Sequence, residues 1–175
     1  MDFLTLSKNR YSCRKYDSTR EIEKEKLDYI LSCASTAPSA CNGQQYHINV
    51  CTGKCAEDIA PMLVGTHVNK FAKEAPVLLV ISEMPYVRSA AIFAERTKND
   101  YRSMDIGILA AYITSAATDV GLGSCILGYF DEQAVRARIG VDGKIRLVIT
   151  LGYSLVEEIP EKKRLPLDEL VTYTK

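Results

Sequence analysis

The segment at residues 76–81 limits the fold of this chain more than any other. A proline is followed there by five consecutive apolar residues, Val-Leu-Leu-Val-Ile, of which three are β-branched and favour a strand. Neighbouring side chains of a strand point to opposite faces, so this strand is apolar on both faces. The segment therefore predicts an interior strand of a sheet, with a packed layer on each side.

Helical patterns elsewhere in the chain can supply those layers. Residues 23–35 combine an apolar stripe with a solvated face of lysines and glutamates. The stripe consists of Ile22, Leu27, Ile30 and Leu31. A long helix is expected at residues 101–120. Its most apolar stretch, residues 106–120, is bracketed by Asp105 and Asp119 and interrupted by threonine and serine, so it is too short and too polar to span a bilayer. We expect a buried core helix that ends at Gly121, a residue suited to a left-handed cap.

Shorter patterns complete a mixed order of helices and strands. Further strands are expected at residues 46–51, 124–129 and 144–151, and further helices at 4–9, 56–63, 84–98 and 132–139. No repeat or composition shift divides the chain, so residues 1–175 are expected to form a single domain. The order predicts an α/β (α+β) fold with a central mixed sheet flanked by helices, followed by a polar, extended tail at 157–175.

The charge balance narrows the classes of partner. Lysine plus arginine and aspartate plus glutamate both total 22, so no net charge attracts the chain to nucleic acid or to an acidic membrane. The chain is too long for a small disulfide-stapled scaffold, and its first residues include an early acid and no long apolar run. We therefore expect a soluble cytoplasmic protein whose six cysteines are reduced.

Two clusters of basic residues lie near opposite ends of the chain. Arg10, Ser12 and Arg14 place two guanidinium groups and a hydroxyl close together in the sequence. Lys162 and Arg164 project to the same side of an extended segment. Guanidinium groups bind phosphate oxygens in pairs, so both clusters together could neutralise a doubly charged phosphate. Taken one at a time, each cluster is more simply explained as solvated surface charge.

Two further segments suit a flat heterocycle. Residues 38–44 form a loop in which Asn42 and Gln44 offer amide donors and acceptors, although an ordinary polar turn has the same composition. Residues 121–128 are rich in glycine, but the dinucleotide-binding fingerprint would need a glycine at the position of Ile126. What remains at residues 121–128 is a backbone of low bulk that can press against a ring.

Together and in this order, the four segments resemble those of the FMN-dependent nitroreductase family, over essentially the whole chain. The matching motifs are Arg10-x-Ser12-x-Arg14, Pro38-Ser39-x-x-Asn42-x-Gln44, Gly121-Leu122-Gly123-x-Cys125-x-x-Gly128 and Lys162-x-Arg164-x-Pro166. The chain departs from the family pattern at Gln45-Tyr46, where Pro-Trp is usual, at Ile126, where tryptophan is common, and at Tyr11, which replaces a basic residue.

The resemblance implies a homodimer that is interlocked by terminal extensions and has two FMN sites at its interface. One subunit would hold the phosphate and ribityl chain through Arg10, Tyr11, Ser12, Arg14, Lys162 and Arg164. The backbone around Leu127 and Gly128 would lie against the ring, and Asn69 would contact its pyrimidine edge. The other subunit would approach the isoalloxazine with Pro38, Ser39, Ala40, Asn42 and Gln44.

The resemblance also implies the reaction. FMN would take hydride from NAD(P)H and, in a ping-pong cycle, reduce a small-molecule acceptor such as a nitroaromatic, a quinone or a flavin. No catalytic side chain and no metal is expected. The acceptor stays open, because the segment at 83–100, where family members often build a substrate lid, is short.

Three alternatives remain open. The first is a non-catalytic FMN carrier or sensor, and the second is a specialised relative with another substrate. The third is a thiol or metal site, but Cys51 and Cys55 lack CxxC spacing and His47 and His67 lack metal-binding spacing. Cys41 would lie near the flavin and is expected to fill space there.

Overall fold

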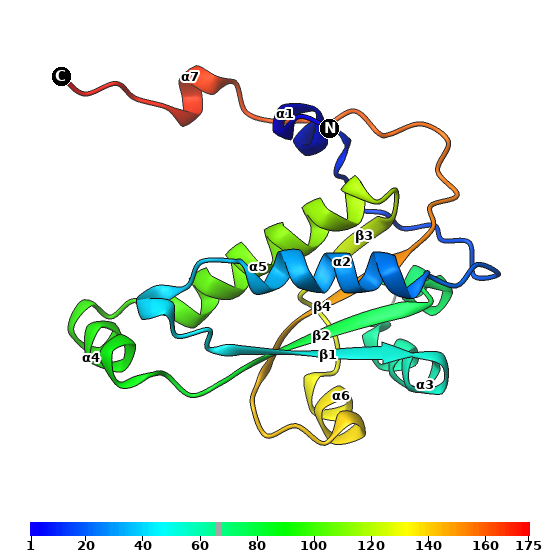
Figure 1. Cartoon of the computed structure of the whole chain (residues 1–175), viewed down its shortest axis with the longest axis horizontal. Helices are drawn as coiled ribbons and strands as arrows, with labels where there is room; N and C mark the ends of the chain where they lie inside the picture. Colours follow the sequence, from blue (N-terminus) through cyan, green and yellow to red (C-terminus); the bar gives the residue numbers. More distant parts are fainter. Residues whose placement is uncertain (66–67) are drawn as a thin grey trace.

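The computed structural model describes residues 1–65 and 68–175 (Figure 1). At the centre of the described part lies a four-stranded sheet in the order β1-β2-β4-β3. The strands are β1 (Tyr46–Thr52), β2 (Val77–Glu83), β3 (Gly123–Leu127) and β4 (Ile145–Gly152). Each of them overlaps a strand expected from the sequence, and the central sheet flanked by helices is confirmed.

All three pairs of neighbouring strands in this sheet run antiparallel. The expectation of a mixed sheet is therefore wrong for these four strands. The helices between the strands suggested that neighbouring strands run parallel. A helix between two strands, however, can return the chain to either end of the sheet, so the next strand can run in either direction. A parallel contact is present outside the four strands, where Ser12 bridges to Ser124 on β3.

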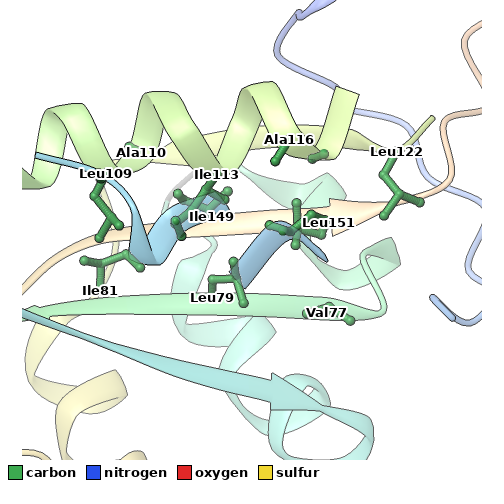
Figure 2. Close-up of a cluster of buried hydrophobic side chains, with 14 of the residues drawn as sticks. Val77, Leu79, Ile81, Leu109, Ala110, Ile113, Ala116, Leu122, Ile149 and Leu151 are labelled. Atoms are coloured by element: carbon green, nitrogen blue, oxygen red, sulfur yellow. The ribbon is translucent and has the colours of Figure 1, made fainter. Parts of the chain in front are cut away.

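The sheet separates two apolar layers. One face is covered by α2 (Lys24–Ser35) and α5 (Tyr101–Asp119), and the other by α3 (Gly53–Leu63) and α6 (Glu132–Ile139). The side chains of β2 alternate between the layers. Val77, Leu79 and Ile81 pack with α2 and α5 (Figure 2), whereas Leu78 and Val80 pack with α3 and α6. All five are buried, which confirms the predicted strand with two covered faces.

Short-range signals determine several helix ends. The carboxylate of Asp131 accepts a hydrogen bond from the backbone N–H of Ala134 (3.0 Å) and begins α6, which ends at Gly140 with a φ of 68°. After α5, Gly121 has a φ of 76°, in the left-handed region that glycine tolerates. The remaining helices are α1 (Phe3–Asn9), α4 (Arg88–Thr97), η1 (Ala40–Asn42), η2 (Lys70–Glu74) and α7 (Leu167–Leu170). The tail is thus less extended than expected, because α7 interrupts it.

The two ends of the chain and one side of α5 are exposed in the isolated protomer. No residue of α1 is buried, and the tail from 157 to 175 is exposed apart from the half-buried Lys162. Met104, Ile108 and Tyr112, spaced four residues apart, form an exposed apolar stripe on α5. No helix in the described ranges has the length and apolar character needed to cross a membrane.

Candidate functional site

The basic residues predicted from the two ends of the sequence meet in one protomer. Arg10 directly follows α1, and the tail passes beside α1, where the Lys162 ammonium donates a hydrogen bond to the backbone oxygen of Ser7 (2.6 Å; Figure 1). Burial lowers the pKa of Lys162, and the nearby charges of Arg10 and Arg164 lower it further. Cations from both ends of the chain therefore lie close enough to repel one another.

The segment after Arg10 runs along β3. Ser12 bridges to Ser124, and the backbone N–H of Cys13 donates to the Ser124 oxygen (2.8 Å). Gly123 permits this approach, since a Cβ at that position would lie 2.8 Å from both Cβ and Sγ of Cys13. In the glycine-rich motif at residues 121–128, Gly123 therefore has a structural reason, which is to let the N-terminal segment pack against the sheet.

The Cys125 thiol connects this segment with the basic residues. Burial raises the pKa of Cys125, while the charge of Arg14, a hydrogen bond from Ser12 and the charge of Arg10 act in the opposite direction. Arg10, Ser12 and Arg14 therefore all lie close to Cys125 on β3. We call Arg10, Arg14, Lys162 and Arg164 the basic cluster.

An open pocket of about 460 Å³ lies beside β3, a size within the range of cofactor sites. It is lined by Arg14, Val68, Asn69 and residues 125–129. Four of the predicted cofactor residues, Arg14, Asn69, Leu127 and Gly128, are thus brought to a single pocket. A second hollow of about 530 Å³ contains none of the predicted residues and has a lining of mixed charge.

Two predicted cofactor residues are held by bonds within the protein. Asn69 has a left-handed φ of 61°, and its side-chain amide donates to the backbone oxygens of Leu63 (3.2 Å) and Tyr129 (2.8 Å). Its carbonyl oxygen is the atom left for a ligand. The Tyr11 hydroxyl shares a hydrogen bond with the Ser154 hydroxyl (2.5 Å), which joins the N-terminal segment to the start of the tail.

The predicted loop at residues 38–44, which we call the amide loop, lies elsewhere in the protomer. The backbone N–H of Ala40 donates to Asp105 at the start of α5 (3.0 Å), whereas α1 lies towards the end of that helix (Figure 1). None of residues 38–44 belongs to the described lining of the pocket. One protomer therefore does not unite Pro38, Ser39, Ala40, Asn42 and Gln44 with the pocket.

A family model decides the classification of the chain. The Nitroreductase family model matches residues 7–66 and 64–153, which include the first three sequence motifs. The chain belongs to the Nitroreductase family. The Bacillus subtilis protein YdgI is 30% identical over 204 residues, which cover 98% of this chain and 97% of YdgI. An oxygen-insensitive NADPH nitroreductase of Helicobacter pylori is 24% identical over 200 residues, or 94% of this chain and 93% of that protein.

A solved structure agrees with this classification over the whole chain. The FMN-dependent nitroreductase of Clostridium difficile is 27% identical to this Nitroreductase family member, with a TM-score of 0.77. The similarity covers 99% of each chain. The architecture expected from the sequence resemblance is therefore shared with a solved family structure.

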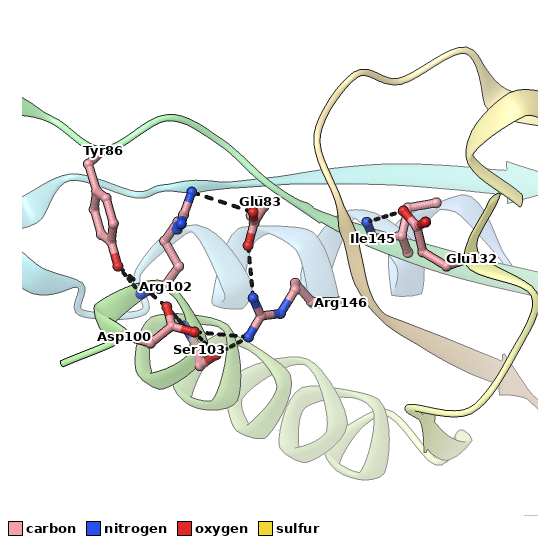
Figure 3. Close-up of polar contacts among 8 residues, drawn as sticks. All are labelled: Glu83, Tyr86, Asp100, Arg102, Ser103, Glu132, Ile145 and Arg146. Carbon is pink, nitrogen blue, oxygen red and sulfur yellow. Dashed lines mark hydrogen bonds and ion pairs between the residues drawn. The ribbon is translucent and has the colours of Figure 1, made fainter. Parts of the chain in front are cut away.

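Sequence reasoning missed a charged network at the start of α5 in this Nitroreductase family member (Figure 3). Glu83 accepts a hydrogen bond from Arg146 (2.9 Å) and lies 3.4 Å from Arg102, and Arg146 also reaches Asp100 (3.1 Å). Hydrogen bonds from Ser103, assisted by Arg146, lower the pKa of Asp100 to about 2. The network ties the start of α5, and thereby the support of the amide loop, to the end of β2 and the start of β4.

Among the described residues, the thiols form no disulfide and no metal-binding group is found. All six cysteines are free, and burial together with the neighbouring Cys55 raises the pKa of Cys51 to about 12. Cys41 is exposed in the isolated protomer. Within residues 1–65 and 68–175, no group of three or more His, Cys, Asp and Glu side chains is arranged to hold a metal. His47 is exposed on β1, and His67 lies outside the described residues.

Proposed function

We propose that this chain is an FMN-dependent oxidoreductase that uses NAD(P)H to reduce a nitroaromatic, quinone or flavin acceptor, and that it acts as a homodimer. The observation that carries the proposal is the meeting of the basic cluster with the pocket beside β3. The names of the two relatives, an NADPH nitroreductase and an FMN-dependent nitroreductase, support the same class of activity.

The basic cluster suits the phosphate of FMN. A phosphate monoester carries between about 1.5 and 2 negative charges near neutral pH. Burial lowers the pKa of Lys162 most, and the neighbouring charges of Arg10 and Arg164 lower it further, so the cations repel one another when no anion lies between them. A phosphate placed among them relieves that repulsion, and Arg10, Arg14 and Arg164 can each pair with its oxygens. Ser12 would add a hydroxyl donor.

The pocket suits the flavin ring. Its described lining combines the Arg14 guanidinium and the Asn69 amide with Ile126, Leu127 and Tyr129, and includes no carboxylate. When bound, FMN supplies the hydride transfer between NAD(P)H and the acceptor. The residues of the chain would then hold the phosphate, orient the ring and limit access of water. Because donor and acceptor would use the same open pocket in turn, the proposal includes ping-pong kinetics.

A homodimer would complete the site. A two-fold axis across the exposed side of α5 can place the amide loop of one protomer at the pocket of its partner. The apolar stripe of Met104, Ile108 and Tyr112 is available for such a contact. The chain ends carry further exposed apolar side chains, on α1 and in the tail, that can wrap around the partner. These are Phe3, Leu4, Leu165, Leu167, Leu170 and Tyr173.

A titration with FMN tests the binding step. The double variant Arg10→Ala, Arg164→Ala removes two charged phosphate contacts, each worth about 1.5–3 kcal/mol, so the Kd is expected to rise at least about a hundredfold. The control Lys24→Ala, Lys54→Ala removes two exposed lysine charges far from the pocket and should leave the Kd unchanged. Equal FMN affinity in all three proteins would reject the phosphate site.

Anaerobic reduction tests the catalytic step separately. NADH or NADPH should bleach the yellow holoprotein, and a quinone or nitroaromatic should restore the colour. A yellow protein that neither nicotinamide reduces would instead be a flavin carrier or sensor. A colourless preparation that takes up no added FMN and contains zinc would support the thiol or metal alternative.

A further inference from the structure

We propose that Asp105 and Gln45 are positioning residues that hold the amide loop in its flavin-contacting conformation before the cofactor binds. The inference rests on the proposed function, because it assigns a task to the loop that would contact the flavin in the dimer. It concerns two buried polar side chains that none of the sequence motifs includes.

The amide loop has a backbone that needs support. Cys41, Asn42 and Gln44 have φ values of 54°, 51° and 47°. The left-handed region is unfavourable for residues with a Cβ, and asparagine tolerates it best. Three such residues within four positions form a strained segment, which persists only when surrounding contacts oppose its relaxation.

Hydrogen bonds within the amide loop connect its residues to one another but not to the rest of the fold, and they include backbone bonds from Asn42 to Ser39 and from Gly43 to Ala40 (3.0 Å each). The Ser39 hydroxyl accepts from the backbone N–H of Gln44 (3.0 Å), and the Gln44 amide donates to the Asn42 oxygen (2.9 Å). Both bonds are exposed to solvent. Exposed hydrogen bonds exchange readily with water and contribute little net stability.

Asp105 supports the amide loop from the start of α5. Its Oδ1 accepts the backbone N–H of Ala40 (3.0 Å), at the residue just before the strained positions. The Asp105 side chain belongs to the rigid helix α5, and the residue is only 3% exposed. Because burial limits competing water, this bond is better protected than the solvent-exposed bonds within the loop.

Gln45 supports the loop from its other end. It is 1% exposed, its side-chain amide donates to the Ala40 oxygen (3.4 Å), and its backbone oxygen accepts from Met84 (3.0 Å). The Gln45 side chain also packs closely against Gly43, because a Cβ at that position would lie 2.0 Å from Gln45 Nε2. Ala40 is therefore bonded through its N–H to α5 and through its oxygen to the residue that precedes β1.

Core stability alone does not account for this arrangement. Asp105 Oδ2, Gln45 Oε1 and the Tyr46 hydroxyl are buried and have no hydrogen-bond partner among the described residues. Apolar side chains of similar size would avoid that cost of burial. Gln45 and Tyr46 are also the positions where this sequence departs from the family pattern. We therefore infer that these polar side chains serve to fix the amide loop rather than to improve the packing of the core.

The test compares Asp105→Ala with the conservative Asp105→Asn and with Thr114→Ala. The asparagine keeps an oxygen that can accept from Ala40. Thr114 is another buried polar residue of α5, whose hydroxyl bonds to Ala110 far from the loop. Amide hydrogen exchange of residues 38–45 is measured in the FMN-free protein, and FMN affinity is measured by quenching of flavin fluorescence.

Asp105→Ala should speed exchange across residues 38–45 roughly tenfold to a hundredfold and weaken FMN binding by a similar factor. Asp105→Asn should stay within about threefold of the wild type in both measurements. Thr114→Ala should lower the melting temperature and change neither. Should Asp105→Ala fail to fold, Gln45→Ala carries the same expectation at the lower end of the range.

Each remaining outcome decides the inference. If amide hydrogen exchange of residues 38–45 is unchanged in both Asp105→Ala and Gln45→Ala, these two residues do not fix the loop and the inference is wrong. Faster exchange with unchanged FMN affinity overturns the link to flavin. If the wild type binds no FMN, the proposed function fails, whereas the exchange data still show whether Asp105 fixes the loop.

Discussion

Replacing Gly123 by alanine tests whether close packing of the N-terminal segment against β3 builds the phosphate site. The new Cβ would lie 2.8 Å from Cβ and Sγ of Cys13, so one of the two segments must move by about 1 Å to reach ordinary contact. Overpacking of this kind costs about 1–3 kcal/mol, or roughly 2–12 °C in melting temperature for a chain of this size. Because Cys13 is flanked by Ser12 and Arg14, the same shift displaces two predicted phosphate donors.

The assay combines thermal unfolding of the apoprotein with a titration of FMN. Gly123→Ala should weaken FMN binding about tenfold to a hundredfold, the equivalent of one charged hydrogen bond. Gly121→Asn is the matched control in the same motif. A Cβ at Gly121 meets nothing within 4 Å, and asparagine tolerates its φ of 76°. If the two variants bind FMN equally well, the close approach at Gly123 does not determine the site.

Three further predictions concern stability and assembly. Glu83→Ala should cost about 1–3 kcal/mol in a urea titration, because it leaves the largely buried guanidinium groups of Arg102 and Arg146 without their shared carboxylate. The pKa of Asp100 is about 2 in the folded chain against an ordinary 3.8, so its contribution is present above the ordinary value and is lost as the pH falls towards 2. The stability gap between wild type and Asp100→Asn should therefore narrow on acidification, by a small amount because this side chain is half exposed. Ile108→Glu places a charge in the apolar stripe of α5 and should give monomers in sedimentation velocity, whereas Gln133→Glu, at an exposed position of α6, should leave dimers.

Local patterns predicted most of the elements, because they depend on neighbours in the sequence. The apolar run of β2 specified burial on both faces, and Asp131 with Gly140 specified both ends of α6. The direction of strand pairing could not be obtained in this way. Alternation and burial identify which face of a strand is covered, but they do not specify its neighbour or whether that neighbour runs in the same direction.

The site residues divide in the same way, into those that a local pattern identifies and those that only the folded structure reveals. Motif residues such as Arg14 and Gly128 were found because their chemistry is visible in the sequence, and they line the pocket. Asp105 was noticed only as an acid that interrupts an apolar helix. Its bond to Ala40 joins residues 65 positions apart, so no local pattern reports it. The burial of Gln45 was likewise hidden, since glutamine after a polar loop ordinarily faces solvent.

The geometry makes cofactor binding and assembly interdependent. Lys162 and Arg164 belong to a tail with little support in its own protomer, and the Lys162 contact with Ser7 lies against α1, which has no buried residue. A phosphate held by the basic cluster would fix the tail and α1 together. The same segments present exposed apolar side chains, including Phe3 and Leu167, to a second chain. Thermodynamic linkage then requires reciprocity: whatever factor FMN adds to the affinity between protomers, dimerisation must add to the affinity for FMN.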